Sequence, residues 1–294
     1  TTVTVGTSKA TLEVGQTYTG SGQIDTVSIG GKPVAKARYD GGSPWVLTGW
    51  DYPGAGVSNA FTYDAGQRPT ARNWTLAGGE KVEDSTALTT GGRVLSERLD
   101  GVDTTYAYDP SGRLTGATTG DRTTHYGFDR DGSLVCVARD LPSPAGSCAT
   151  DAGHTTNTYA NGILTATDDP EAKLPAADAR YTANGNLRGV GTAALEYDGY
   201  EEVTKISDGD SSTFITRDAS GRVVAMAPSA TAPGTRLLYS SGDSDTPVAS
   251  VGPDGAVQFA TPLPGGLLWR SSGLDIVSLQ GHPSIALTSA GARD

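Results

Sequence analysis

The chain has 294 residues and a formal net charge of −11 at pH 7. That charge argues against nucleic-acid binding, which needs a basic surface, and against attraction to an anionic membrane. No apolar run approaches the roughly 18 residues that a spanning helix needs. Forty glycines and one methionine are typical of a turn-rich β protein. No initiator Met and no signal-peptide pattern stand at Thr1, so we expect a piece of a longer protein.

Residues 1–38 differ from the rest of the chain. β-branched and polar residues alternate there without a recurring phrase, and we expect irregular leading strands or degenerate repeats. Residues 39–294 are expected to form one array of short strands, with a looped insertion at about 141–178 that is rich in Pro, Ala, Asp and Thr. Clean helical periodicity is absent, so the sequence predicts strands and turns.

The tract 41–56 holds the densest group of aromatic residues, Trp45, Trp50 and Tyr52. Large aromatic side chains usually fill a core or cap it. Exposed aromatic faces also suit the CH groups of sugars, so these three residues are the candidate ligand-binding residues.

One phrase returns along the array: FTYDAGQRPTA (61–71), YAYDPSGRLTGA (106–117), YGFDRDGSLVCV (126–137) and ITRDASGRVVAM (215–226). Tyr106 and Tyr108 are two residues apart, so both rings face one side of a strand. The following Asp-Pro-Ser-Gly favours a tight turn, in which Asp109 accepts hydrogen bonds from turn amides. Each copy therefore predicts a β-hairpin, and the clearest spacing, Gly112 to Gly132, is 20 residues.

A single hairpin buries too little apolar surface to be stable in water. Neighbouring hairpins must cover one another, which predicts an all-β, mostly antiparallel sheet with a ladder of tyrosines.

Two cysteines, Cys136 and Cys148, lie on either side of the segment LPSPAGS. We expect a disulfide that closes a small loop and stabilises the fold by about 2–3 kcal/mol. Two buried free thiols are the alternative. A disulfide would favour an extracellular or cell-surface location. A metal site is not expected, because no histidine pair completes four ligands.

Candidate catalytic groups lack a local motif. The three histidines, His125, His154 and His282, belong to no nucleophile elbow, and the close aspartates Asp168 and Asp169 suit solvated turns. We therefore predict no catalytic residue, no cofactor and no metal.

The repeated phrase resembles the YD repeats of the Rhs and teneurin family. LTGATTGDRTTHYGFDRDGSL (114–134) carries the resemblance in one pass, and LQGHPSIALTSAG (279–291) is similar to a late strand of that family's cores. The resemblance covers about residues 39–291. It implies a β-hairpin array that forms a spiral or partial shell. In bacterial members, including Rhs toxins and TcC subunits, the shell encloses a toxic C-terminal segment; in teneurins it belongs to an adhesive ectodomain.

The chain departs from that family at its end. The family's closing Tyr-x-Ala-Arg-x-Tyr-Asp-Pro stretch and its aspartate-dependent self-cleavage motif do not occur before Asp294. Self-cleavage is therefore not carried over.

Together these observations predict a non-enzymatic, secreted or surface scaffold, either part of a toxin-encapsulating shell or an adhesive protein. Its partner would be an encapsulated polypeptide or a surface glycan. Two alternatives stay open: a carbohydrate-binding module that uses exposed aromatics, and a glycoside or other hydrolase on a β-repeat fold. A propeller blade needs a period of roughly 40–45 residues, which the 20-residue spacing does not match.

Overall fold

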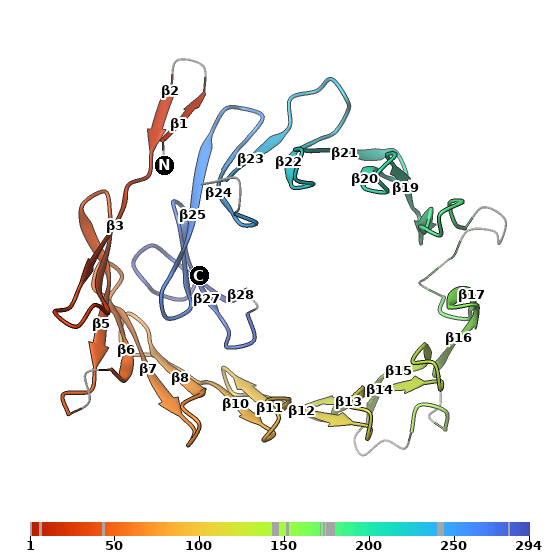
Figure 1. Cartoon of the computed structure of the whole chain (residues 1–294), viewed down its shortest axis with the longest axis horizontal. Coiled ribbons are helices and arrows are strands. Elements are labelled where there is room, and N and C mark those ends of the chain that lie inside the picture. Colours follow the sequence, from red (N-terminus) through yellow and green to blue (C-terminus); the bar gives the residue numbers. More distant parts are fainter. Residues whose placement is uncertain are drawn as a thin grey trace. The chain divides into compact units, whose positions relative to one another are not determined.

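The computed structural model describes residues 2–5, 8–42, 45–142, 147–150, 153–170, 172, 174, 180–239, 244–281 and 283–294. Every regular element in these ranges is a β-strand (Figure 1), which confirms the predicted all-β class. None of the described segments forms a helix able to cross a membrane.

The chain divides into two compact units. Unit 1 joins a first stretch, Thr1–Asp103, to a last stretch, Leu238–Asp294; unit 2 is Thr104–Leu237. The strands of the first stretch are β1 (Thr2–Val5), β2 (Ser8–Thr11), β3 (Val14–Tyr18), β4 (Ile24–Ile29), β5 (Lys32–Tyr39), β6 (Leu47–Tyr52), β7 (Val57–Tyr63), β8 (Pro69–Thr75), β9 (Lys81–Val82), β10 (Asp84–Leu88) and β11 (Val94–Leu99).

Unit 2 and the last stretch continue in the same manner. The strands that lie in unit 2, or begin or end in it, are β12 (Val102–Tyr108), β13 (Leu114–Thr119), β14 (Arg122–Phe128), β15 (Leu134–Pro142), β16 (Thr155–Ala160), β17 (Ile163–Thr167), β18 (Gly189–Val190), β19 (Ala193–Tyr197), β20 (Val203–Asp208), β21 (Ser211–Arg217), β22 (Val223–Ala227) and β23 (Thr235–Tyr239). The last stretch adds β24 (Pro247–Val251), β25 (Val257–Leu263), β26 (Leu267–Arg270), β27 (Gly273–Val277) and β28 (Pro283–Leu287).

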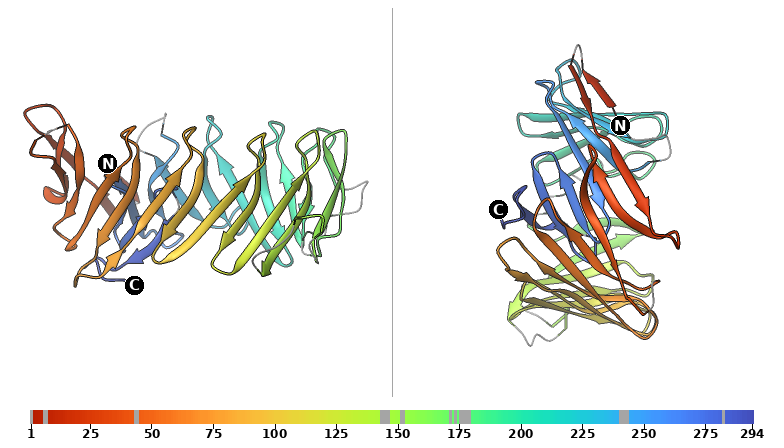
Figure 2. Two further views of the ribbon diagram at one scale, coloured as in Figure 1. Left: turned by 90° about the horizontal axis from the view of Figure 1, so that it is seen from below. Right: turned by 90° about the vertical axis from the view of Figure 1, so that its left-hand side faces the viewer.

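Neighbouring strands pair antiparallel, nearly always with the next strand along the chain. β12 and β13 show the repeating pattern: Tyr106 faces Ala117, and the register shifts by a β-bulge at Tyr108, just before the turn. A bulge increases the local right-handed twist of the strand where the chain enters the turn. The hairpins of unit 2 lie side by side in Figure 2, as the repeat predicted.

The core of unit 1 lies between its two stretches. Strands β4–β9 contribute buried side chains on one face, including Val27, Trp50 and Trp74, and the last stretch covers them with residues such as Leu267 and Ile276. In Figure 1, β27 and β28 lie on the side of β6–β8 that carries this core. Unit 1 is therefore a two-layer β structure whose second layer comes from the end of the chain.

The boundaries expected from the sequence stay predictions. β5 (Lys32–Tyr39) runs across the expected boundary at residue 38 and pairs with β6. The expected insertion at 141–178 includes the hairpin β16–β17, and parts of it lie outside the described residues.

Candidate functional site

In three of the four copies of the phrase, an aspartate and an arginine four residues apart hold the turn; in the copy at 126–137, Ser133 takes the place of the arginine. Asp109 Oδ1 accepts a hydrogen bond from the Arg113 amide at 2.9 Å, and Arg113 Nε donates to Asp109 Oδ2 at 2.7 Å. Gly112 takes the left-handed conformation between them, with φ 84°. Asp64 with Arg68, and Asp218 with Arg222, repeat these bonds. The predicted role of the aspartates as turn acceptors is confirmed.

Two further kinds of contact join neighbouring hairpins. Tyr63 donates its hydroxyl to the carbonyl of Leu47 in the preceding hairpin at 2.8 Å. Arg113 Nη1 donates to the Asp129 carbonyl of the next hairpin at 2.8 Å, and its guanidinium lies 5.0 Å from the Phe128 ring centroid. The tyrosine contact recurs at 2.7 to 3.2 Å in Tyr39 to Ile24, Tyr159 to Leu134, Tyr181 to Leu164 and Tyr197 to Leu187. The aspartate thus holds its own turn, the tyrosine contacts the preceding hairpin, and the arginine takes part both in the turn and in the contact with the next hairpin.

The left-handed turn position offers a stability test within unit 1. Gln67 holds this position with φ 62°, whereas Gly22 holds it with φ 86° and has open space where a Cβ would be. A non-glycine residue in this conformation costs roughly 1 kcal/mol. We expect Gln67→Gly to raise, and Gly22→Ala to lower, the free energy of unfolding by up to about 1 kcal/mol. Urea titration followed by tryptophan fluorescence measures both; changes of the same sign would contradict this reading.

The turn aspartates also predict a pH dependence. The Arg68 amide and side chain hold the pKa of Asp64 below its ordinary value of 3.8. The charged form therefore stabilises the folded chain above about pH 4, and this contribution is lost as the pH falls through the lowered pKa. We expect the difference in unfolding free energy between the wild type and Asp64→Asn to be constant from pH 7 to about 5 and to narrow below about 4. Urea titration at each pH measures this difference. A difference that widens in acid would contradict the lowered pKa of Asp64.

A second set of polar residues lies buried between the layers of unit 1. We call Tyr52, Asn59, Arg72 and Asp84 the latch. Tyr52 donates its hydroxyl to the Pro264 carbonyl at 2.6 Å, and Asn59 Nδ2 donates to the Gly265 carbonyl at 2.8 Å. Burial raises the pKa of Tyr52, so its hydroxyl stays a donor.

Arg72 and Asp84 form the charged half of the latch. Their side chains are 7% and 5% exposed, and Nη2 lies 2.7 Å from Oδ2. Arg72 also donates to the carbonyls of Gly265 and Val277, while the Leu279 amide donates to Asp84 at 2.9 Å. Burial raises the pKa of Asp84, although Arg72 and the Leu279 amide act to lower it. Each charge of this buried pair also has backbone partners, which a buried ion pair needs.

Two glycines let the backbone approach the latch. Gly265 and Gly266 have φ 84° and 88°, and together with Pro264 they form what we call the docking turn. A Cβ on Gly266 would lie 1.6 Å from Arg72 Nη1, and one on Gly265 would lie 2.5 Å from the Tyr52 hydroxyl. The latch therefore contacts the docking turn only through main-chain groups of that turn.

The rim of this interface carries opposite charges. Arg293 in the last stretch donates to Glu80 at 2.6 Å and to Asp100 at 2.7 Å, both in the first stretch. The Ala77 amide donates to the Gly291 carbonyl at 3.2 Å beside them.

The structure separates the three aromatic residues considered as ligand-binding candidates. Trp50 and Tyr52 are 3% and 1% exposed, so the expectation that their faces are exposed is wrong. They alternate with Asp51 on β6 and point into the core, where Tyr52 stacks on Trp74 with ring centroids 5.9 Å apart. Trp45 is 69% exposed, and glycan binding through it stays a prediction.

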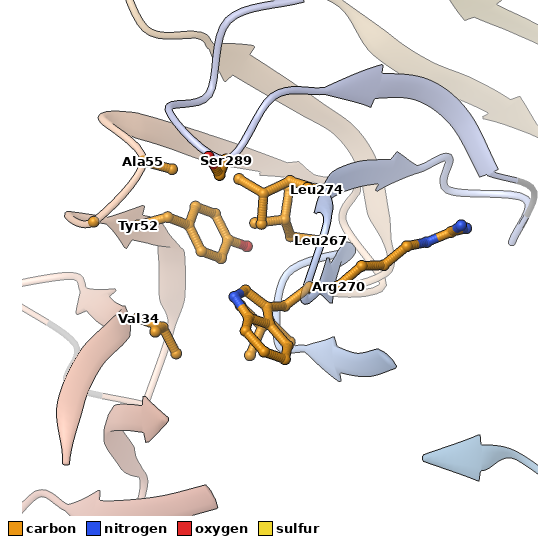
Figure 3. A pocket seen from close by; sticks show the side chains of 11 residues that line it. Val34, Tyr52, Ala55, Leu267, Arg270, Leu274 and Ser289 are labelled. Atoms are coloured by element: carbon orange, nitrogen blue, oxygen red, sulfur yellow. The ribbon is translucent and has the colours of Figure 1, made fainter. Parts of the chain in front are cut away.

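A small cavity borders the latch. It has a volume of about 140 Å³ and is lined by Val34, Tyr52, Leu267, Leu274 and others (Figure 3). Ligand pockets usually enclose roughly 300–1,000 Å³. This cavity therefore fits a packing space between two layers better than a substrate site.

The predicted disulfide between Cys136 and Cys148 is present, with Cα atoms 6.0 Å apart. Both residues are 6% exposed and pack with Ala138. Gly127 on the adjacent strand leaves room for them, because a Cβ there would lie 3.1 Å from Cys136 Cβ.

The remaining candidate groups lie on several elements, and His154 is near enough to Asp168 for its charge to help lower the pKa of that carboxyl. His125 is on β14, facing Gly116 on β13, and His282 is outside the described residues. Asp168 accepts from the Thr156 hydroxyl at 2.8 Å, and Asp169 pairs with Arg139 at 3.0 Å. Among the described residues, no group of three or more His, Cys, Asp or Glu side chains could hold a metal ion.

No family model matches the chain, and no curated protein matches it in sequence. Solved structures do. The chain is similar to the Photorhabdus luminescens Tc holotoxin pore with a substituted TccC3, at a TM-score of 0.64, 16% identity and 95% coverage of this chain. The chain thus has the fold of a β-hairpin array like the one in this Tc toxin structure. Crystal structures of TcdB2-TccC3-TEV and TcdB2-TccC3 give TM-scores of 0.64 and 0.63, again at 16% identity and 95% coverage.

This likeness concerns the fold alone. The chain spans only 16 to 17% of the length of those three chains. The predicted YD-repeat-like architecture is supported at this level, and membership of the family stays a prediction.

Proposed function

We propose that the chain is a non-enzymatic structural scaffold that forms part of the wall enclosing a toxin polypeptide. The observation that carries this proposal is the match of nearly the whole chain to Tc toxin structures. The repeat supports it, because its aspartates, tyrosines and arginines are engaged in holding turns and joining hairpins. An extracellular location is part of the proposal, since the buried disulfide suits an oxidising compartment.

The natural polypeptide that contains these residues provides the test. After limited proteolysis under native conditions, we expect the hairpin array to stay intact and to elute together with a further polypeptide segment, identified by mass spectrometry. The same segment should be digested quickly once the array has been unfolded in urea. Equal digestion of the segment in both states would contradict the proposal.

Glycan recognition is a second candidate function. In unit 2 a polar hollow of about 370 Å³ is lined by Asn184, Asn186, Glu196 and Glu201, and Tyr200 in the adjoining turn is 90% exposed. Amide and carboxylate groups beside an exposed aromatic ring suit the hydroxyls and CH faces of a sugar.

A glycan array with the full chain tests this second function. We expect Tyr200→Ala to lose at least about ten-fold in affinity if the hollow binds sugar, and Trp45→Ala to do so if the exposed tryptophan does. The two variants act as controls for each other, because they lie in different units. Absence of binding to every glycan by the wild type would exclude this function.

A further inference from the structure

Unit 1 is assembled from two stretches that lie on either side of all of unit 2 in the sequence. The first stretch has its own hydrogen-bonded ladder from β3 to β8, in which each strand pairs with the next. The last stretch has a separate ladder from β24 to β28. The first stretch can therefore keep its strand pairing while the last stretch is undocked and its own ladder is open.

The contact between the layers has the features of a binding interface. Its centre is apolar, with Trp50, Trp74, Leu267 and Ile276 at 3% exposure or less. The latch lies beside this centre and binds main-chain groups of the last stretch, and Arg293 lies at the rim between two carboxylates. An apolar centre with a charged, complementary rim is typical of interfaces between separate proteins.

The latch recognises one kind of partner. The latch donates hydrogen bonds to the carbonyls of Pro264 and Gly265 in the docking turn. Position 266 must be glycine, because the Cβ of any other residue would clash with Arg72. The partner must therefore be a β-hairpin that presents a glycine turn of this geometry. The last stretch of the chain itself fits.

We propose that docking of the last stretch onto the face of β5–β8 is a discrete, reversible step. It opens and closes while the paired strands of the first stretch, and all of unit 2, stay folded. During synthesis this step comes last, because the docking turn is made after unit 2. Until then the last stretch does not cover the face that carries Trp50 and Trp74. This inference does not depend on the proposed function.

Two glycine variants of the full chain isolate the step. Gly266 and Gly281 both lie in the last stretch, with φ 88° and 87°, so alanine causes the same backbone strain at either position. Only at Gly266 does the added Cβ meet Arg72; at Gly281 the space is open. Gly281→Ala is therefore the matched control for Gly266→Ala.

Hydrogen exchange followed by mass spectrometry gives the readout. In Gly266→Ala we expect amides of β25–β27 to exchange at least about ten-fold faster than in Gly281→Ala, by a common factor. Amides of β12–β14 in unit 2, and of the ladder β5–β7, should change little. If exchange instead rises equally in all three regions, the last stretch does not open separately and the proposal is wrong.

Arg293→Ala offers a milder variant in case Gly266→Ala does not fold. It removes only the rim contacts with Glu80 and Asp100, and we expect a several-fold rise in exchange in the same strands. No rise there would count against the proposal. Sedimentation at several concentrations checks that docking occurs within one chain; a dimer that keeps β25–β27 protected would contradict this assignment.

Discussion

Arg72→Met is expected to destabilise unit 1 by about 3 kcal/mol or more, because removal of one partner leaves a buried charge uncompensated. Asp84 would lose its guanidinium partner and keep the Leu279 amide as a donor. The carbonyls of Gly265 and Val277 would lose the same donor. Methionine has a similar length, so the loss of packing is small.

Tryptophan fluorescence during urea unfolding measures this effect cleanly, since all four tryptophans, Trp45, Trp50, Trp74 and Trp269, belong to unit 1. Arg68→Met is the matched control. It breaks a pair of the same type, with Asp64, whose side chains are 39% and 24% exposed, and should cost less than about 1 kcal/mol. If the two variants are equally destabilised, the latch does not stabilise unit 1 as proposed.

The pH dependence of the Arg72→Met effect has a definite sign. Burial raises the pKa of Asp84 above its ordinary value of 3.8, so the folded chain binds this proton more readily than the unfolded chain. Arg72 lowers this pKa, so the shift is larger in the variant, and the unfolding free energy of the variant rises more than that of the wild type as the pH falls. The variant should therefore recover part of its loss in mild acid. The pKa of Asp64 lies below 3.8, so the cost of Arg68→Met should stay constant down to a lower pH, which makes this variant a control here as well.

Removal of the disulfide with Cys136→Ala and Cys148→Ala together is expected to lower the stability of unit 2 by about 2–3 kcal/mol. The closed loop between the cysteines regains its freedom in the unfolded chain, and the buried sulfurs no longer hold β15 to the segment before β16. A loss of this size should lower the melting temperature by roughly 5–10 °C.

Far-UV circular dichroism and tryptophan fluorescence together locate the effect. The dichroism transition of unit 2 should move to lower temperature, whereas the fluorescence transition should stay, because unit 2 contains no tryptophan. Wild-type protein with a reducing agent should behave like the double variant. A disulfide without structural effect would leave both transitions in place.

The repeat made the hairpins predictable because its chemistry is local. Asp109, Gly112 and Arg113 lie within one turn, so spacing alone indicates the hydrogen bonds that they form. The disulfide could be predicted for a similar reason, since only two cysteines exist. The pairing of tyrosine hydroxyls with the preceding hairpin follows from stacking, although the sequence does not say which carbonyl accepts.

The latch could not be predicted in this way. Arg72 and Gly265 are 193 residues apart, and no periodic pattern links them. The core-filling interpretation of Trp50 and Tyr52 is confirmed, but the sequence could not say what covers them, because side chains of the last stretch lie far from residues 41–56 in the sequence. One signal was present, the paired glycines 265 and 266 after Pro264, because adjacent glycines often allow a close approach of two backbones.

A cryo-electron microscopy map of the complete natural polypeptide that carries these residues tests the proposed scaffold role most directly. We predict the hairpin array of residues 39–291 in the map, with density for a further polypeptide segment against one face of its sheets. Sheets that face bulk solvent on both sides, with no such density, would contradict the account.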